Sequence, residues 1–302
     1  MRTGVVVSVL VLIAIGVAFI IRFTSLSGQD KKDTASAATG TADHAGKKER
    51  SLKVADRWEV PDILKEISGI AYAGPEEFLC VQDETGSVYV YHAGDRQIRK
   101  EIPFGKSGDY EDLAIVGNSV FVLESSGKLY EIERFMDPTP RVKEYPSILT
   151  RFDSEGLWFD QRSDRLLIAV KESDSGDEDE NGQVSEMLVY AFDLKSRKMV
   201  QEPVFRVPLD NPVLPKGKDS RAKFKPSAIA MHPGTGEVYL LEGVKSRLLI
   251  LAPDGKPDRL HKFSGKDLKQ PEGLAFAPDG QLYVCSEGSK KVPGVIASVT
   301  GF

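Results

Sequence analysis

From Leu52 onward, the chain alternates short apolar runs with polar turns and has no long segment of helical period. The stretch 270–288 shows the pattern most clearly. An acidic residue and a glycine open one apolar strand, Leu274–Ala277, and a Pro-Asp-Gly turn leads into a second, Leu282–Cys285. Glu287 follows this second strand, so we expect the opening acid and Glu287 at the same end of an antiparallel pair.

The opening step of this stretch occurs five times along the chain. The five steps are Ser68-Gly69-Ile70, Glu111-Asp112-Leu113, Glu155-Gly156-Leu157, Ser227-Ala228-Ile229 and Glu272-Gly273-Leu274. Successive steps lie about 43 to 45 residues apart, except that the third unit runs to about 72 residues, an excess that we attribute to insertions. A period of this size, with several short strands in each unit, is typical of a propeller with four-stranded blades. The sequence therefore predicts an all-β fold, a five-bladed β-propeller.

The two ends of this region predict how the ring closes. The fifth unit ends after its third strand, Val295–Val299, while a spare strand-like segment, Val54–Val60, precedes the first unit. We expect this N-terminal segment to supply the missing outer strand of the fifth blade, which would protect the last edge of the sheet. The predicted propeller domain covers residues 52–302.

The N-terminal region differs in composition from the propeller. Gly4–Ile21 is apolar and flanked by arginines, and a helix of that length would span about 27 Å, close to the thickness of a bilayer core. We predict that residues 1–23 are a transmembrane signal anchor at the cell membrane, crossing once, with the propeller exported to a periplasmic or outer-facing side. Ser25-Leu26-Ser27 resembles a cleavage site, so removal of the leader is the alternative. Residues 24–51 are small and polar and predict a disordered linker.

Charge and cysteine content exclude two classes of function. The net charge is -5, and no basic stripe interleaved with aromatic residues is visible, so nucleic acid is not expected as a partner. Cys80 and Cys285 lack the spacing of a zinc or redox motif. In the aligned repeats they lie one position apart, which predicts side chains on opposite sheet faces. We interpret them as core thiols, with a disulfide as the alternative.

Acidic residues recur at the end of the second strand in every unit. These residues are Asp83, Glu124, Glu172, Glu242 and Glu287. In a propeller, the ends of second strands and the starts of first strands share one face near the axis. With Glu111, Asp112, Glu155 and Glu272 at the strand starts, up to nine carboxylates are expected around one funnel mouth.

Such a concentration of carboxylates favours a bound cation. Neighbouring carboxylates raise one another's pKa unless a positive charge compensates them. Many oxygen ligands without Cys or His suit Ca²⁺, and they suit Mg²⁺ less well because it requires a tighter octahedron. The alternative is that these acids are solvated or bind backbone amides of neighbouring blades.

The third unit contains two insertions. Asp177-x-Asp179-x-Asn181-Gly182 matches the first half of a calcium loop of the EF-hand type, but the twelfth position is Leu188 rather than Glu. We favour a solvated acidic loop there. The second insertion, Gln201–Lys225, is rich in Pro, Lys and Asp and is expected to cover one face as a lid, a partner surface or a long loop.

The sequence offers little for nucleophilic catalysis. It contains no Gly-x-Ser-x-Gly motif. His232 is expected at the end of the propeller opposite the acids, and His92 and His261 in outer-strand regions. A metal-activated water with Glu155 or Glu272 as general base is the remaining catalytic possibility.

The repeat starts at Ser68, Glu111 and Glu155, together with Val170-Lys171-Glu172 and the apolar leader, resemble the SdiA-regulated (YjiK-like) family of bacterial envelope proteins. The resemblance covers Leu52–Phe302. It implies a five-bladed propeller, distantly similar to NHL repeats, with a calcium site and no established activity. On matching positions, the preferred ligands it implies are Glu111, Glu155, Glu172 and Glu272. The long acidic insertion after Glu172 departs from the family pattern.

Three functional hypotheses follow. The first is a membrane-anchored, exported propeller that binds Ca²⁺ in its acidic funnel and recognises a ligand or a protein there. The second is a calcium-dependent hydrolase of an ester, a lactone or a phosphate, similar to gluconolactonases or phytase-like esterases, although similarity of fold does not carry function. The third is a scaffold whose acids only bind backbone amides.

Overall fold

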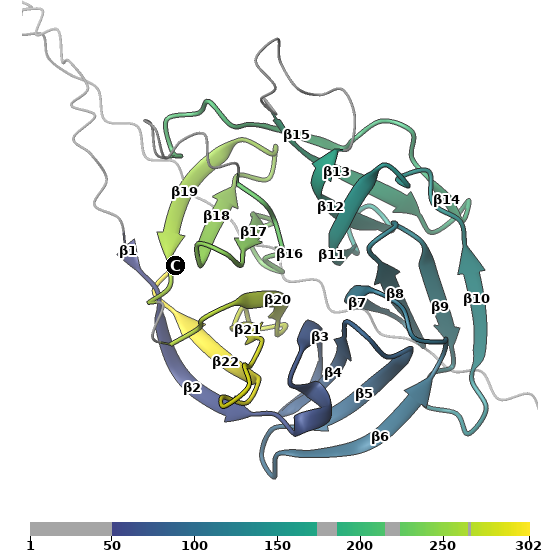
Figure 1. Cartoon of the computed structure of the whole chain (residues 1–302). Coiled ribbons are helices and arrows are strands. Elements are labelled where there is room, and N and C mark those ends of the chain that lie inside the picture. The colour runs from purple at the N-terminus through teal and green to yellow at the C-terminus, as the bar shows by residue number, and fades with distance from the viewer. Residues whose placement is uncertain (1–49, 174–185, 215–223, 265–266) are drawn as a thin grey trace, which may run out of the picture. The chain divides into compact units, whose positions relative to one another are not determined.

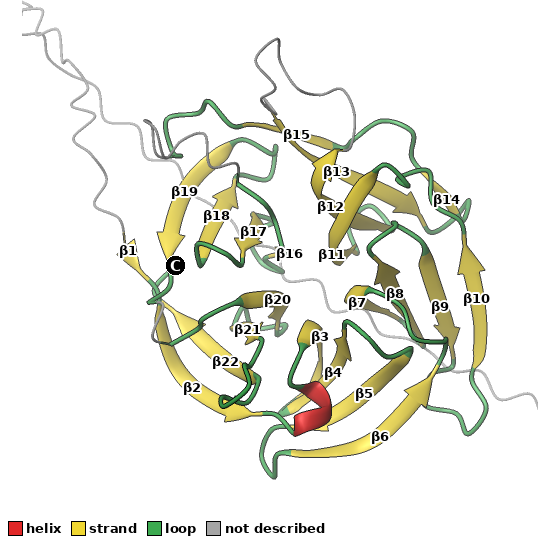
Figure 2. Cartoon of the chain, viewed as in Figure 1, coloured by secondary structure: helices red, strands yellow, loops and turns green. Residues whose placement is uncertain are grey.

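The computed structural model describes residues 50–173, 186–214, 224–264 and 267–302. Nearly all of its regular structure is strand, and the short 3-10 helix η1 (Asp62–Leu64) lies between two strands (Figure 2). Within these ranges, no helix has the length and apolar character needed to cross a bilayer. The predicted anchor at residues 1–23 and the calcium-type loop at Asp177–Gly182 lie outside the described residues.

The described strands form five sheets, as the repeat predicts. The first sheet contains β3 (Ile67–Gly74), β4 (Glu77–Gln82), β5 (Ser87–His92) and β6 (Gln97–Pro103). The second contains β7 (Tyr110–Val116), β8 (Ser119–Glu124), β9 (Leu129–Glu133) and β10 (Arg141–Tyr145). The third contains β11 (Phe152–Asp160), β12 (Arg165–Ser173), β13 (Glu186–Asp193), β14 (Lys198–Met199) and β15 (Phe205–Pro208).

The last two sheets incorporate the N-terminal strands. The fourth contains β16 (Ala228–Met231), β17 (Val238–Glu242), β18 (Arg247–Leu251), β19 (Pro257–Lys262) and β1 (Arg50–Ser51). The fifth contains β20 (Pro271–Phe276), β21 (Leu282–Ser286), β22 (Val295–Thr300) and β2 (Lys53–Glu59). Because β2 pairs antiparallel with β22, the predicted closure of the ring by an N-terminal strand is confirmed. The parallel pairing of β1 with β19 was not predicted.

The five sheets are arranged around a central axis as blades (Figure 1). The first strand of each blade lies nearest the axis; these inner strands are β3, β7, β11, β16 and β20. Each inner strand contacts the inner strand of the next blade, and β20 contacts β3, which closes the ring. The described part of the chain is therefore a closed five-bladed β-propeller. The starts of the five inner strands lie at one end of the axis, which places the repeated acidic steps together.

The core consists of five apolar layers, one between each pair of neighbouring blades. Alternation along β17 shows how the layers form, because successive side chains of a strand point to opposite faces. Leu240 packs in the layer shared with the third blade, and Leu241 packs in the layer shared with the fifth. Cys80 and Cys285 are both buried in the layer between the first and fifth blades and form no disulfide, so the interpretation as core thiols is confirmed.

The second insertion of the third blade differs from the expectation. Part of Gln201–Lys225 is not a loop over one face, because β15 pairs with the first half of β13 while β14 pairs with its end. Val207 of β15 is fully buried in the layer between the third and fourth blades. This segment therefore belongs to the outer edge of the third blade, which its proline content had obscured.

The close approach of neighbouring inner strands depends on glycine. A Cβ atom on Gly156 of β11 would lie 2.6 Å from the backbone nitrogen of Ile229, on the next blade. We expect Gly156→Ala to lower the free energy of unfolding by about 1 to 3 kcal/mol, because the backbone has to shift to admit the methyl group. Gly74→Ala is the matched control, since nothing lies within 4 Å of its Cβ position. If Gly156→Ala and Gly74→Ala unfolded at the same urea concentration, this would contradict the expectation.

Candidate metal centre

A β-bulge recurs at the first residue of the repeated acidic or serine step, near the start of the inner strand in four blades. Between the two inner strands of a blade, the pairing register skips one residue, and the skipped residues are Ser68, Glu111, Glu155 and Glu272. A bulge bends the strand and redirects the side chain of the unpaired residue. The same bulge thus leaves Glu111, Glu155 and Glu272 unpaired at the end of the propeller where the inner strands start, which is called the mouth below.

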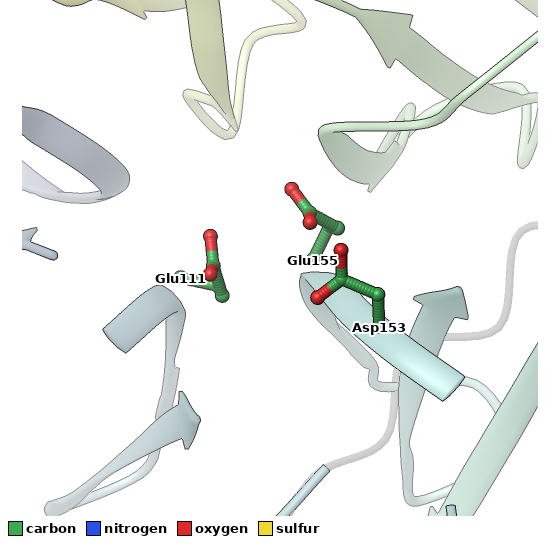
Figure 3. A group of neighbouring side chains, drawn as sticks. All are labelled: Glu111, Asp153 and Glu155. Carbon is green, nitrogen blue, oxygen red and sulfur yellow. The ribbon is translucent and has the colours of Figure 1, made fainter. Parts of the chain in front are cut away.

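Glu111, Asp153 and Glu155 form a compact group at this mouth. Glu111 belongs to β7 and the other two belong to β11, and the three carboxylates point toward one another (Figure 3). One oxygen from each lies within 4.8 Å of the others. Ca²⁺ binds oxygen at about 2.3 to 2.6 Å, so three oxygens grouped this closely could share one Ca²⁺ ion after small movements of their side chains. Ca²⁺ suits them better than Mg²⁺, because Mg²⁺ requires a tighter octahedron at about 2.0 to 2.1 Å.

Lys171 provides a positive charge beside this group. Its Nζ donates to Glu155 Oε1 at 2.8 Å and lies 3.9 Å from Asp153 Oδ2. The register of β11 against β12 also skips Lys171, because Asp153 pairs with Glu172 and Ser154 pairs with Val170. Both members of the Lys171–Glu155 ion pair are therefore bulged residues, which lets them meet at the mouth.

One ammonium group does not balance the carboxylates around it. Burial raises the pKa of Glu155 to about 7, and Asp153 and Glu272 add to the effect while Lys171 opposes it. Burial raises the pKa of Glu111 further, and the charges of Glu155 and Asp109 act in the same direction. A divalent cation would relieve this repulsion and hold the carboxylates in their charged form.

Glu272 and Glu287, two further predicted ligands, lie at the mouth but outside the group of three. Burial raises the pKa of Glu272, while hydrogen bonds from Gln270 and Ser227 oppose the rise. Burial and the charge of Glu272 raise the pKa of Glu287 to about 7, and Gln270 Nε2 donates to Glu287 at 2.7 Å. Both acids add negative potential to the site.

Asp83, Glu124 and Glu242 were also predicted as ligands, and the structure gives the last two other partners. Glu124 accepts hydrogen bonds from the Tyr130 hydroxyl at 2.9 Å and from Ser126. Glu242 is 2% exposed and forms a buried ion pair with Arg247. Burial and the charge of Glu66 raise the pKa of Asp83, so it remains a feature of the acidic mouth. The side chain of Glu172, the remaining predicted ligand, lies outside the described part of the structure.

Asp153 is the member of the group that the repeat alignment did not find. The alignment starts the third unit at Glu155, whereas β11 begins at Phe152 and extends past it. The signal was the Asp-x-Glu spacing, which places two acids close together at the start of β11, where the bulge at Glu155 redirects its side chain. The structure therefore unites two predicted ligands, Glu111 and Glu155, with one acid that only their local spacing indicates.

The raised pKa values predict how pH affects cation stabilisation. A carboxyl whose pKa is about 7 in the folded state and about 4.3 when unfolded stabilises the fold below pH 4.3, and this contribution is lost as pH rises toward 7. Without cation, Glu155 and Glu287 thus cost stability at pH 7.5 that they do not cost at pH 4.5. We expect saturating Ca²⁺ to raise the melting temperature more at pH 7.5 than at pH 4.5. Equal shifts in differential scanning calorimetry at both pH values would contradict this expectation.

The comparison with known proteins identifies the fold. No protein-family model matches the chain, and no curated protein is similar to it in sequence. Among solved structures, it is similar to glutaminyl cyclase from Myxococcus xanthus, with a TM-score of 0.57 and 15% identity over 83% of this chain and 96% of that chain. The chain is a β-propeller protein.

Two further propellers extend this comparison. The PQQ-bound aldose sugar dehydrogenase from Streptomyces coelicolor matches with a TM-score of 0.52 and 12% identity, over 83% of this chain and 98% of that chain. Regucalcin from Agrobacterium tumefaciens, a calcium-binding protein, matches with a TM-score of 0.49 and 14% identity, over 84% of this chain and 95% of that chain. At such low identity, the similarities to the glutaminyl cyclase and to the dehydrogenase show the fold alone, and the function has to be argued from the site.

Proposed function

We propose that this propeller binds Ca²⁺ through Glu111, Asp153 and Glu155, and that the bound ion forms part of a ligand- or protein-recognition site at the mouth. The observation that carries the proposal is the convergence of three carboxylates from two blades within 4.8 Å. The donor set consists of hard oxygens, which suits Ca²⁺. Three carboxylates also leave coordination positions open to a ligand, because Ca²⁺ takes six to eight oxygens.

The resemblance to the SdiA-regulated (YjiK-like) family supports the same reading. It implies a calcium site on a five-bladed propeller, and Glu111 and Glu155 are among the positions it indicates. The predicted anchor at residues 1–23 would make this an exported protein at the cell membrane, where millimolar Ca²⁺ suits an exposed site of moderate affinity. Fractionation of cells producing the full chain or a chain lacking residues 1–23 tests the location, since only the full chain is expected in the membrane fraction.

A calcium-dependent hydrolase of an ester, a lactone or a phosphate is the second candidate. The open coordination positions favour it, together with Glu272, a half-buried carboxyl of raised pKa at the same mouth. Glu272 would hold or accept a proton there, and Ca²⁺ would supply charge stabilisation. Activity toward these three substrate classes that is lost with chelator would support this candidate over a purely binding role.

The direct test is isothermal titration of Ca²⁺ into the chelator-treated protein, with Mg²⁺ in a parallel titration. We expect one Ca²⁺ per chain and much weaker binding of Mg²⁺. At a free Ca²⁺ concentration of about 100 times the dissociation constant, the fold should gain about 2.7 kcal/mol, which is a rise of about 5 to 10 °C in melting temperature. Absence of both heat and a thermal shift would refute the calcium site.

A further inference from the structure

We infer that Asp112 is a positioning residue for the cation site, tying β7 to β11 and so setting the separation of Glu111 and Glu155. The inference rests on the proposed calcium function and adds to it a residue that does not touch the ion. Asp112 follows Glu111 directly in β7, and its side chain bridges to the strand that carries Asp153 and Glu155.

The bridge consists of two short hydrogen bonds. The backbone N–H of Leu113 donates to Asp112 Oδ1 at 2.8 Å, and the backbone N–H of Leu157 donates to Asp112 Oδ2 at 2.7 Å. The first donor belongs to the second blade and the second donor to the third blade. Asp112 is 1% exposed, so water does not compete for either bond. A carboxylate held at both oxygens fixes the distance between the two strands.

Neighbouring groups prevent Asp112 from moving away. A Cβ atom on Gly69 of β3 would lie 2.6 Å from Asp112 Cα and 2.7 Å from Asp112 Oδ1, so the first blade packs directly behind it. Leu157 lies two residues after Glu155 on the same strand. Because the bridge is one residue from Glu111 and two from Glu155, any change in the separation of the strands is transmitted to both carboxylates.

Among the five repeats, only the second has an acidic residue at the position of Asp112. The other four repeats have glycine or alanine at the equivalent position, namely Gly69, Gly156, Ala228 and Gly273. At two other blade junctions a serine at the start of the inner strand donates to the next blade: Ser68 donates to Tyr110 O at 2.7 Å, and Ser227 donates to Pro271 O at 3.1 Å. The two-bond carboxylate thus lies at the junction from which Glu111 and Glu155 converge.

Asp112→Asn tests the role because it keeps the size of the side chain. Its amide nitrogen cannot accept from a backbone N–H, so one of the two bonds is lost and a buried donor is left without a partner. We expect the dissociation constant for Ca²⁺ to rise about ten-fold to a hundred-fold, the usual cost of losing a group that orients metal ligands. Asp160→Asn is the control, because Asp160 is a buried acid at the far end of β11, where it accepts hydrogen bonds from Arg162 N and Arg165 Nε. It should lower the melting temperature without changing the Ca²⁺ affinity.

Luminescence of bound Tb³⁺, a probe of the same size class as Ca²⁺, separates positioning from general stability. Lifetimes in H₂O and D₂O report how many waters remain on the ion. We expect more water bound to Tb³⁺ in Asp112→Asn than in the wild type, because a carboxylate that moves away from the ion is replaced by water. Unchanged affinity and water number in a folded Asp112→Asn protein would overturn the positioning role alone. Failure of the wild type to bind either ion would overturn the calcium function and the inference together.

Discussion

Replacing Glu111 and Glu155 together by glutamine is expected to abolish Ca²⁺ binding. The change removes two of the three converging carboxylates while keeping their shape. Neutral amide oxygens bind Ca²⁺ far less strongly than carboxylates, and the loss of two charges should weaken binding at least about a hundred-fold. Isothermal titration at pH 7.5 measures the effect, and Tb³⁺ luminescence should be lost in parallel.

The double variant should remain folded, which makes the result interpretable. Both acids have a raised pKa because they are buried among like charges, so neutral replacements relieve repulsion in the cation-free protein. Asp254→Asn is the matched control, because Asp254 is an exposed acid in the turn between β18 and β19, at the opposite end of the propeller. Unchanged Ca²⁺ affinity in the double variant would show that these two residues are not ligands.

Deleting β2 (Lys53–Glu59) is expected to destabilise the entire propeller. β2 is the outer strand of the fifth blade, and its removal exposes the edge of β22. It also removes Trp58, whose ring packs against Tyr283 with 6.3 Å between centroids. The combined loss should be about 5 kcal/mol or more, comparable with the whole stability of many domains. Urea denaturation followed by circular dichroism measures it.

The control for this deletion is Arg57→Gln, which changes an exposed side chain of β2 and keeps the strand. It should shift the unfolding midpoint by no more than about 0.5 kcal/mol in free energy. If the protein without β2 unfolded at the same urea concentration as the wild type, the strand would be an accessory and not the closure of the ring. A protein that aggregates on production would agree with an exposed edge at β22.

The sequence predicts the architecture well because the fold repeats its own local chemistry. Five acidic or serine steps, spaced by about 43 to 45 residues except where insertions lengthen the third unit, give the number of blades. A strand missing at one end, with a spare at the other, gives the closure. β15 was not predicted, because a proline-rich insertion is typical of a loop. The pairing of β15 with β13 depends on tertiary packing, which the local sequence does not show. The parallel pair β1 and β19 has only two residues on each side, too few for a sequence pattern.

The site is predicted only in part, because its geometry depends on irregularities in the ladder. Glu111 and Glu155 follow from the repeat, whereas Asp153 joins them because β11 starts earlier than the repeat step. The position of Lys171 depends on a register shift between β11 and β12. Sequence alignment treats Glu124 and Glu242 as equivalent to the other acids, yet Tyr130 and Arg247 pair with them. Both partners come from the neighbouring strand of the same blade, so they depend on the side chains that each blade places beside its acid.

A crystal structure grown with Ca²⁺, with Tb³⁺ used to locate the ion by anomalous scattering, tests the calcium site most directly. We predict one ion at the mouth of the propeller, bound by Glu111, Asp153 and Glu155 at about 2.4 Å, with water completing its coordination. The Lys171 ammonium should then lie farther from Glu155 than the present 2.8 Å. The absence of an ion at saturating Ca²⁺, with the Lys171–Glu155 pair intact, would contradict the proposed site.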